Sequence, residues 1–125
     1  DGAVVDYAAT AGQEILKDIL ETDEGARRLG EVALVAHDSP ISQTGLLFKN
    51  TLFDENASCH VALGSAYAEN HVRGKEMSPE EKKQSGMNHS ITHVDFMVGG
   101  PSLNVTGVQK DGSRVPLLVN GRWVI

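Results

Sequence analysis

The chain has 125 residues, of which 40% are hydrophobic and 22% are charged, and its formal net charge is −6. These values are ordinary for one globular domain, so a disordered chain is not the expected class. No Lys/Arg cluster accompanies aromatic residues and no apolar run approaches the roughly 20 residues that span a bilayer, so we expect neither a nucleic-acid-binding nor a membrane protein.

The cysteine content bears on the cellular compartment. Cys59 is the only cysteine, so no disulfide can form within the chain. The first residues also lack the basic-then-apolar pattern of a signal peptide. Both features favour a reducing compartment, and we expect a cytoplasmic protein.

The first predicted elements are a turn, a strand and a helix. Asp1-Gly2 is typical of a hairpin turn and Val4-Val5 suits a strand, but no partner strand precedes them. This pattern indicates a chain cut from a larger protein. Residues 13–28 have the period of an amphipathic helix. The apolar face of this helix consists of Ile15, Leu16, Ile19 and Leu20.

Short strands and turns are predicted in the middle of the chain. Residues 31–35 read as a buried strand, and Ser39-Pro40 begins a turn. Residues 46–48 suggest another short strand. Residues 58–63 alternate as a strand that ends at Gly64.

A short helix is predicted to begin after Ser78. Ser78 suits the N-cap, Pro79 the first helical position and Glu81 the third, which is the pattern of a capping box. We expect this helix to end near Gly86.

The last part of the chain is predicted to consist of strands joined by hairpin turns. Three strands are expected, at residues 91–98, 103–108 and 113–119. Asn120-Gly121 is a hairpin turn that leads into residues 122–125. The whole pattern predicts one α+β domain, residues 1–125, with a mainly antiparallel sheet, one longer helix and one short helix.

His93 and Asp95 are the most informative pair for chemistry. Alternate residues of a strand point to the same face, so the two side chains project together from Cα atoms about 6.6 Å apart. An imidazole and a carboxylate so placed can each bind one ion of a close metal pair, or share one ion. On the residues alone, a purely structural pair remains an alternative.

His60 follows Cys59 on a predicted strand, so the two side chains point to opposite faces. Cys59 therefore cannot use His60 as the base that a cysteine nucleophile needs, and we expect Cys59 to be a small buried residue. His60 faces the other side and is available for a ligand. A structural histidine is the alternative interpretation.

Glu31 and Tyr67 lie at strand ends. Glu31 begins an apolar strand, where a solvated carboxylate is the alternative to a ligand, and Tyr67 follows Gly64-Ser65-Ala66, where a packing residue is the alternative. The chain thus offers oxygen and nitrogen donors without thiolate pairs. This mixture suits zinc, cobalt or manganese ions.

Several longer segments resemble the thermophilic-type aminopeptidases, the M29 family of metallopeptidases. The first runs from Arg27 to Val35 as RRLGEVALV. The second is NTLFDENASCH, which ends at His60 and is followed by GSAY, residues 64–67. The third is SGMN, residues 85–88, running on to HVDFMVG, residues 93–99. Residues 14–25 are similar as well, so the resemblance covers essentially the whole chain in order.

The resemblance implies an enzyme that uses two divalent metal ions to remove N-terminal residues from peptides, and that forms a homodimer. The resemblance, carried over by position, implies that five residues of this chain are metal ligands, with Tyr67 matching a tyrosine close to the metals: Glu31, His60, Tyr67, His93 and Asp95. Tyr67 is therefore the candidate catalytic residue.

One departure from the family changes the expectation for this chain. Family members are longer, and their pattern includes a further glutamate ligand and an α/β domain upstream of the residues matched here. We therefore expect a C-terminal, metal-binding portion that binds one ion or none and has little peptidase activity. Two alternatives stay open: a non-catalytic β-rich dimerisation module, and another metal-dependent amidase or esterase.

Overall fold

The computed structural model of the protein describes residues 2–125, so the predicted turn at Asp1-Gly2 lies partly outside the described residues. The chain divides into two compact units. Unit 1 contains the residues up to Val32 together with Val61–Phe96, and unit 2 contains Ala33–His60 together with Met97–Ile125.

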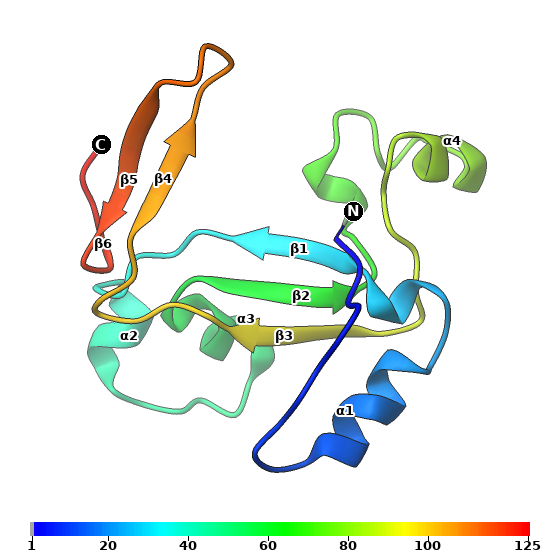
Figure 1. Ribbon diagram of the computed structural model, residues 1–125, viewed down its shortest axis with the longest axis horizontal. Helices are drawn as coiled ribbons and strands as arrows, with labels where there is room; N and C mark the ends of the chain where they lie inside the picture. Colours follow the sequence, from blue (N-terminus) through cyan, green and yellow to red (C-terminus); the bar gives the residue numbers. More distant parts are fainter. Residues whose placement is uncertain (1) are drawn as a thin grey trace. The chain divides into compact units, whose positions relative to one another are not determined.

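The helices are short and the strands make up two sheets (Figure 1). The helices are α1 (Gln13–Leu20), α2 (Pro40–Thr44), α3 (Thr51–Asp54) and α4 (Pro79–Gln84), with 3-10 turns at Gly25–Arg27, Glu55–Ala57 and Ala68–Asn70. The strands are β1 (Leu29–Ala33), β2 (His60–Gly64), β3 (His93–Met97), β4 (Val105–Val108), β5 (Arg114–Val119) and β6 (Arg122–Trp123). No helix within residues 2–125 has the length and apolar character needed to cross a membrane.

Both sheets have three strands and are antiparallel. The first has the order β1-β2-β3 and is carried by unit 1 apart from the strand-end residues Ala33, His60 and Met97. The second has the order β4-β5-β6 and belongs to unit 2. The predicted α+β class with mainly antiparallel strands is therefore confirmed, although the β-structure is divided between two sheets and the helices are more numerous than predicted.

The first helix is shorter than the predicted 13–28, because α1 ends at Leu20. Beyond that point the Asp23 carboxylate accepts hydrogen bonds from the N–H of Ile91, the hydroxyl of Ser90 and the N–H of Ala26. These bonds, led by the one from Ile91, hold the pKa of the Asp23 carboxyl below its ordinary value of 3.8. Long-range hydrogen bonds thus outweigh helix propensity after Leu20. On the predicted apolar face Leu20 is 1% exposed, whereas Ile15 is 67% exposed.

The strand predicted at residues 31–35 forms two residues earlier, as β1. Its start is fixed by the N-terminal segment, where Ala3 and Arg28 form an antiparallel bridge and the N–H of Leu29 donates to the carbonyl of Gly2. The predicted strand at Val4-Val5 does not form, although the N–H of Val4 donates to the carbonyl of Arg27 beside this bridge. The prediction that residues 31–35 are buried is wrong, because Val32 is 66% exposed.

The helix after Ser78 is confirmed. Ser78 accepts a hydrogen bond from the N–H of Glu81, and the Glu81 carboxylate accepts one from the N–H of Ser78. This reciprocal pair satisfies two donors that a helix start leaves without intrahelical partners. The helix α4 that follows ends at Gln84, close to the predicted end.

Unit 2 is built around a hairpin and a small apolar core. Asn120 and Gly121 both have positive φ, 48° and 71°, as a tight two-residue turn between β5 and β6 requires. The core consists of Ala36, Cys59 and Leu118, with Leu103 and Val105 packed against it. The predicted burial of Cys59 is confirmed, and its thiol also contacts the backbone N–H and carbonyl of Val35, at 3.3 and 3.2 Å.

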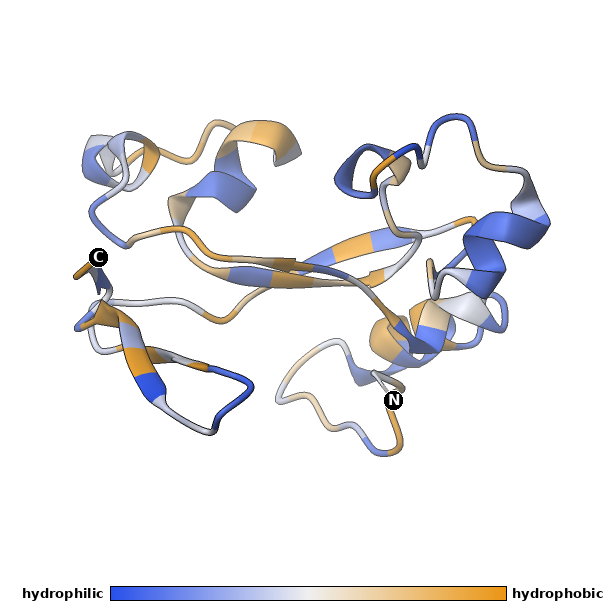
Figure 2. Cartoon of the chain, turned by 90° about the horizontal axis from the view of Figure 1, so that it is seen from above, coloured by the Kyte–Doolittle hydropathy of each residue, from blue (hydrophilic) through white to orange (hydrophobic). Residues whose placement is uncertain are grey.

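The predicted strand at residues 46–48 does not form. The segment is a loop between α2 and α3, held by the Asp54 carboxylate, which accepts hydrogen bonds from the N–H groups of Phe48 and Asn50. Ser39 and Asn50 cap α2 and α3, two short helices that the sequence patterns do not predict. Apolar residues of this loop and of α3 are exposed, and they form a hydrophobic stretch in Figure 2.

Candidate metal centre

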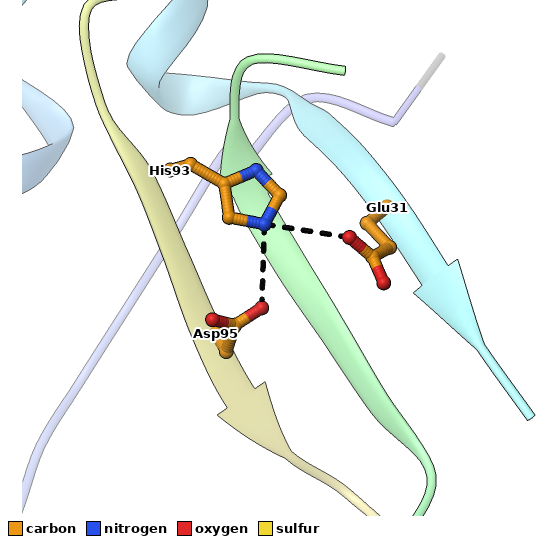
Figure 3. A group of neighbouring side chains, drawn as sticks. All are labelled: Glu31, His93 and Asp95. Carbon is orange, nitrogen blue, oxygen red and sulfur yellow. Dashed lines mark ion pairs between the residues drawn. The ribbon is translucent and has the colours of Figure 1, made fainter. Parts of the chain in front are cut away.

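Three side chains of unit 1 converge on one point. His93 and Asp95 stand on the same face of β3, as their spacing predicts, and the His93 Nε2 lies 3.4 Å from the Asp95 Oδ1. Glu31 comes from β1, and its Oε2 lies 3.4 Å from the same nitrogen. Because β2 runs between β1 and β3, the carboxylates reach towards the imidazole from either side of the middle strand (Figure 3).

These side chains are largely withdrawn from solvent. The side chains of His93, Glu31 and Asp95 are 16%, 19% and 12% exposed. The His93 Nε2 and the Asp95 Oδ1 are buried and have no hydrogen-bond partner within residues 2–125. Buried polar atoms are costly when they are left unpaired, so native proteins pair them with protein groups, with water or with an ion.

The spacing and chemistry of the three donors fit a divalent metal ion. One ligand atom from each of Glu31, His93 and Asp95 lies within 4.8 Å of the other two. Two ligands bound tetrahedrally at about 2.0–2.1 Å from a zinc ion lie about 3.4 Å apart, which is the separation of Nε2 from each carboxylate oxygen. One imidazole with two carboxylates is a donor set that suits zinc, cobalt and manganese.

The orientation of the His93 ring is set by its other nitrogen. The His93 Nδ1 lies 2.7 Å from the backbone carbonyl oxygen of Ser65. A carbonyl oxygen can only accept, so Nδ1 carries the proton and donates it. In the neutral ring this leaves the Nε2 lone pair directed at Glu31 and Asp95, which is the form that a metal ion requires.

Tyr67 lies beside this group. Its ring centroid is 4.6 Å from that of His93, with the ring planes inclined by 47°. The side chain is 48% exposed and lines an open pocket of about 230 Å³ together with Met87, Asn88 and other residues of unit 1. Tyr67 is therefore placed where a molecule from solvent can reach it next to His93.

Four of the five predicted site residues come together in unit 1, namely Glu31, Tyr67, His93 and Asp95. His60 belongs to unit 2, at the first position of β2. Its side chain is 1% exposed, and its Nδ1 lies 3.0 Å from the carbonyl oxygen of Ser58. In both His60 and His93, therefore, Nδ1 faces a backbone carbonyl and Nε2 points away from it.

Sequence patterns indicate no role for the backbone around Ser65, although the Ser65 carbonyl is the direct partner of a candidate ligand. A backbone group leaves no side-chain signature. The available signal was indirect: Gly30 and Gly64 both lie in strands, where a glycine often marks a close approach of another backbone.

The chain is similar to a family of known proteins over nearly its whole length. The family model described as thermophilic metalloprotease (M29) matches residues 1–123. Aminopeptidase AmpS of Bacillus subtilis (strain 168) is 58% identical over 123 residues, which are 98% of this chain and 30% of AmpS. Aminopeptidase T of Thermus aquaticus is 56% identical over 124 residues, which are 99% of this chain and 30% of that protein.

A solved structure shows the same fold. Wild-type AmpT from Thermus thermophilus matches with a TM-score of 0.86 and 50% sequence identity, over 99% of this chain and 30% of that chain. The chain therefore spans about 30% of the length of these relatives.

Proposed function

The chain belongs to the thermophilic metalloprotease family M29, and from this membership we propose that it is the C-terminal, metal-ligand-bearing part of a dinuclear metalloaminopeptidase. The substrates are peptides, from which the enzyme removes N-terminal residues. The observation that carries the proposal is the convergence of Glu31, His93 and Asp95 around two buried polar atoms that lack a hydrogen-bond partner within residues 2–125. The names of the relatives, all aminopeptidases, supply the reaction.

The five candidate residues of this chain divide between the two metal ions. Glu31, His93 and Asp95 bind one divalent ion, supported by their spacing of 3.4 Å about Nε2. His60 and Tyr67 contribute to the pair of ions, together with a further glutamate from outside these 125 residues. Zinc, cobalt and manganese all suit this donor set.

The chemistry requires positive charge beside the scissile peptide bond. Divalent ions in such a site polarise the carbonyl group and acidify a water molecule. The carboxylates of Glu31 and Asp95 offset the charge of the ions, and the Ser65 carbonyl keeps the His93 ring in its ligating orientation. Tyr67, half exposed beside His93, either donates a hydrogen bond to the developing oxyanion or binds a metal directly.

Metal removal tests the proposal. In the complete protein that carries this chain, release of N-terminal residues from short peptides is expected to stop after chelation and dialysis, and to return when zinc, cobalt or manganese is added. The readout is the free amino acid formed over time. A control peptide with an acetylated N-terminus should not be cleaved. Undiminished activity in protein shown to be free of metal would remove the metal from the mechanism.

Replacing Tyr67 by Phe tests the assignment of the candidate catalytic residue. The ring and its contact with His93 are kept, whereas the hydroxyl is lost. If Tyr67 stabilises the oxyanion, kcat is expected to fall by about 100-fold, the usual effect of losing one such donor, with metal content unchanged. If it binds a metal, the metal content falls as well. Unchanged kcat in the Tyr67→Phe protein would exclude both roles.

Two further parts of the proposal concern the setting of the enzyme. We place it in the cytoplasm and as a homodimer. Exposed apolar side chains of unit 2, such as Leu47 and Leu52 at 75% and 72% exposure, are available for contacts with other protein surface. Cell fractionation and sedimentation velocity measure the two properties, and a monomer of the complete protein would contradict the second.

A further inference from the structure

The backbone carbonyl that orients His93 is itself held in place by neighbouring segments of unit 1. Ser65 follows Gly64, the last residue of β2, and its N–H donates to the carbonyl of Thr92 at 2.7 Å. Its own carbonyl accepts a hydrogen bond from the Nδ1–H of His93, at 2.7 Å. Ser65 therefore bonds to the consecutive residues Thr92 and His93, the second of which begins β3, and any shift of its backbone moves the acceptor of the His93 proton.

Gly30 makes room for this carbonyl. A Cβ atom at Gly30 would lie 2.5 Å from the Ser65 carbonyl oxygen and closer still to the carbonyl oxygen of Gly64. Both contacts are with backbone atoms, which cannot swing aside as the end of a flexible side chain can. Only glycine at this position lets β1, which carries Glu31, approach the segment that orients His93.

Asn88 holds the same segment with both its side chain and its backbone. The Asn88 Nδ2 donates to the carbonyl oxygens of Gly64 and Gly25, at 2.6 and 2.8 Å. The backbone carbonyl of Asn88 accepts the N–H of Ala66 at 2.9 Å. Asn88 thus bonds to the residues before and after Ser65, which restricts the direction of the peptide carbonyl between them.

We infer that Gly30 and Asn88 are positioning residues, which fix the Ser65 carbonyl against the His93 Nδ1–H and thereby keep the Nε2 lone pair directed at the metal position between Glu31 and Asp95. The metal-binding consequence rests on the proposed function, whereas the position of the His93 proton does not. Partners that orient a metal-binding histidine typically change metal affinity by about 10- to 100-fold when they are altered.

The test uses two variants and a matched control for each. Gly30→Ala places a methyl group against the Ser65 carbonyl, and its control is Gly107→Ala in β4, where the nearest atom would be at an ordinary 3.5 Å. Asn88→Ala removes the amide donor, and its control is Asn56→Ala, because the Asn56 amide donates to the local Leu52 carbonyl at 3.0 Å. Circular dichroism of each variant establishes that it is folded.

Two readouts are taken on the complete protein that carries this chain. The first is the two-bond ¹H–¹⁵N correlation spectrum of the His93 ring in metal-free protein at alkaline pH. The second is Zn²⁺ affinity by competition with a chromogenic chelator. The wild-type spectrum is expected to show the form protonated at Nδ1. Gly30→Ala and Asn88→Ala are expected to alter that signal and to weaken Zn²⁺ binding by about 10- to 100-fold, whereas both controls match the wild type.

The inference is overturned if a folded Gly30→Ala or Asn88→Ala protein keeps both the wild-type ring signal and the wild-type affinity. It is also overturned if wild-type His93 is protonated at Nε2 instead, a result that stands even if neither variant folds. If the wild-type protein shows the expected signal but binds no Zn²⁺, the proposed function fails and the positioning of His93 survives.

Discussion

Replacing His93 by Ala is expected to lower the affinity of the complete protein for Zn²⁺ by more than about 100-fold, because altering even the groups that only orient a ligand costs 10- to 100-fold. The His93 Nε2 is the atom that Glu31 and Asp95 share, at 3.4 Å from a carboxylate oxygen of each. Without the imidazole, two carboxylates of like charge face one another with no nitrogen donor between them. Competition titration against a chromogenic chelator measures the loss.

Two further variants sharpen this experiment. Asp95→Asn keeps the shape of the side chain and removes its charge, so it should also weaken binding. His89→Ala removes an exposed histidine from the segment before β3 and serves as the matched control. Equal Zn²⁺ affinity in the His93→Ala and His89→Ala proteins would show that the ion binds elsewhere.

The 125-residue chain on its own is expected to release N-terminal residues at least about a thousandfold more slowly than the complete protein, because a two-metal site clamps the reacting groups only when both ions are held. The chain spans about 30% of the length of its relatives, and we expect one glutamate ligand to come from outside these 125 residues. The measurement compares the two proteins at equal concentration with saturating zinc, cobalt or manganese.

A control separates lost chemistry from lost folding in this comparison. Circular dichroism and a Zn²⁺ titration of the isolated chain establish whether Glu31, His93 and Asp95 still bind an ion. Peptide cleavage by the isolated chain at a rate close to that of the complete protein would contradict the assignment of an external ligand.

Local rules were sufficient wherever the structure depends on neighbours in the sequence. The alternation of strand residues places His93 and Asp95 on one face, and the pattern from Ser78 to Glu81 produces a capping box. The Asn120-Gly121 turn follows from the tolerance of these residues for positive φ. In each case the determining contacts lie within a few residues.

Long-range contacts account for the errors. The predicted first helix runs too far, because nothing local reveals that Asp23 pairs with Ser90 and Ile91. Residues 46–48 have a strand-like composition, but the Asp54 carboxylate holds that segment as a loop. The apolar character of Val32 predicted burial, whereas burial depends on what packs against the strand, and Val32 is 66% exposed.

In the candidate site, too, long-range contacts determine what local sequence patterns cannot predict. The position of Glu31 beside His93 depends on the order β1-β2-β3, which periodicity cannot supply. Its place at the start of a strand made Glu31 a candidate with a solvated carboxylate as the alternative, and the resemblance to a family then matched it to a metal ligand. The support from Ser65 depends on a backbone carbonyl and was not predicted at all. Whether His60 joins the same centre stays a prediction.

The most direct measurement is anomalous X-ray diffraction from crystals of the complete protein loaded with zinc, recorded on both sides of the zinc absorption edge. We predict an anomalous peak about 2.0–2.2 Å from the Nε2 of His93 and from carboxylate oxygens of Glu31 and Asp95, as zinc–nitrogen and zinc–oxygen distances require. Zinc bound by other residues in catalytically active crystals, with no peak between these three side chains, would contradict the account.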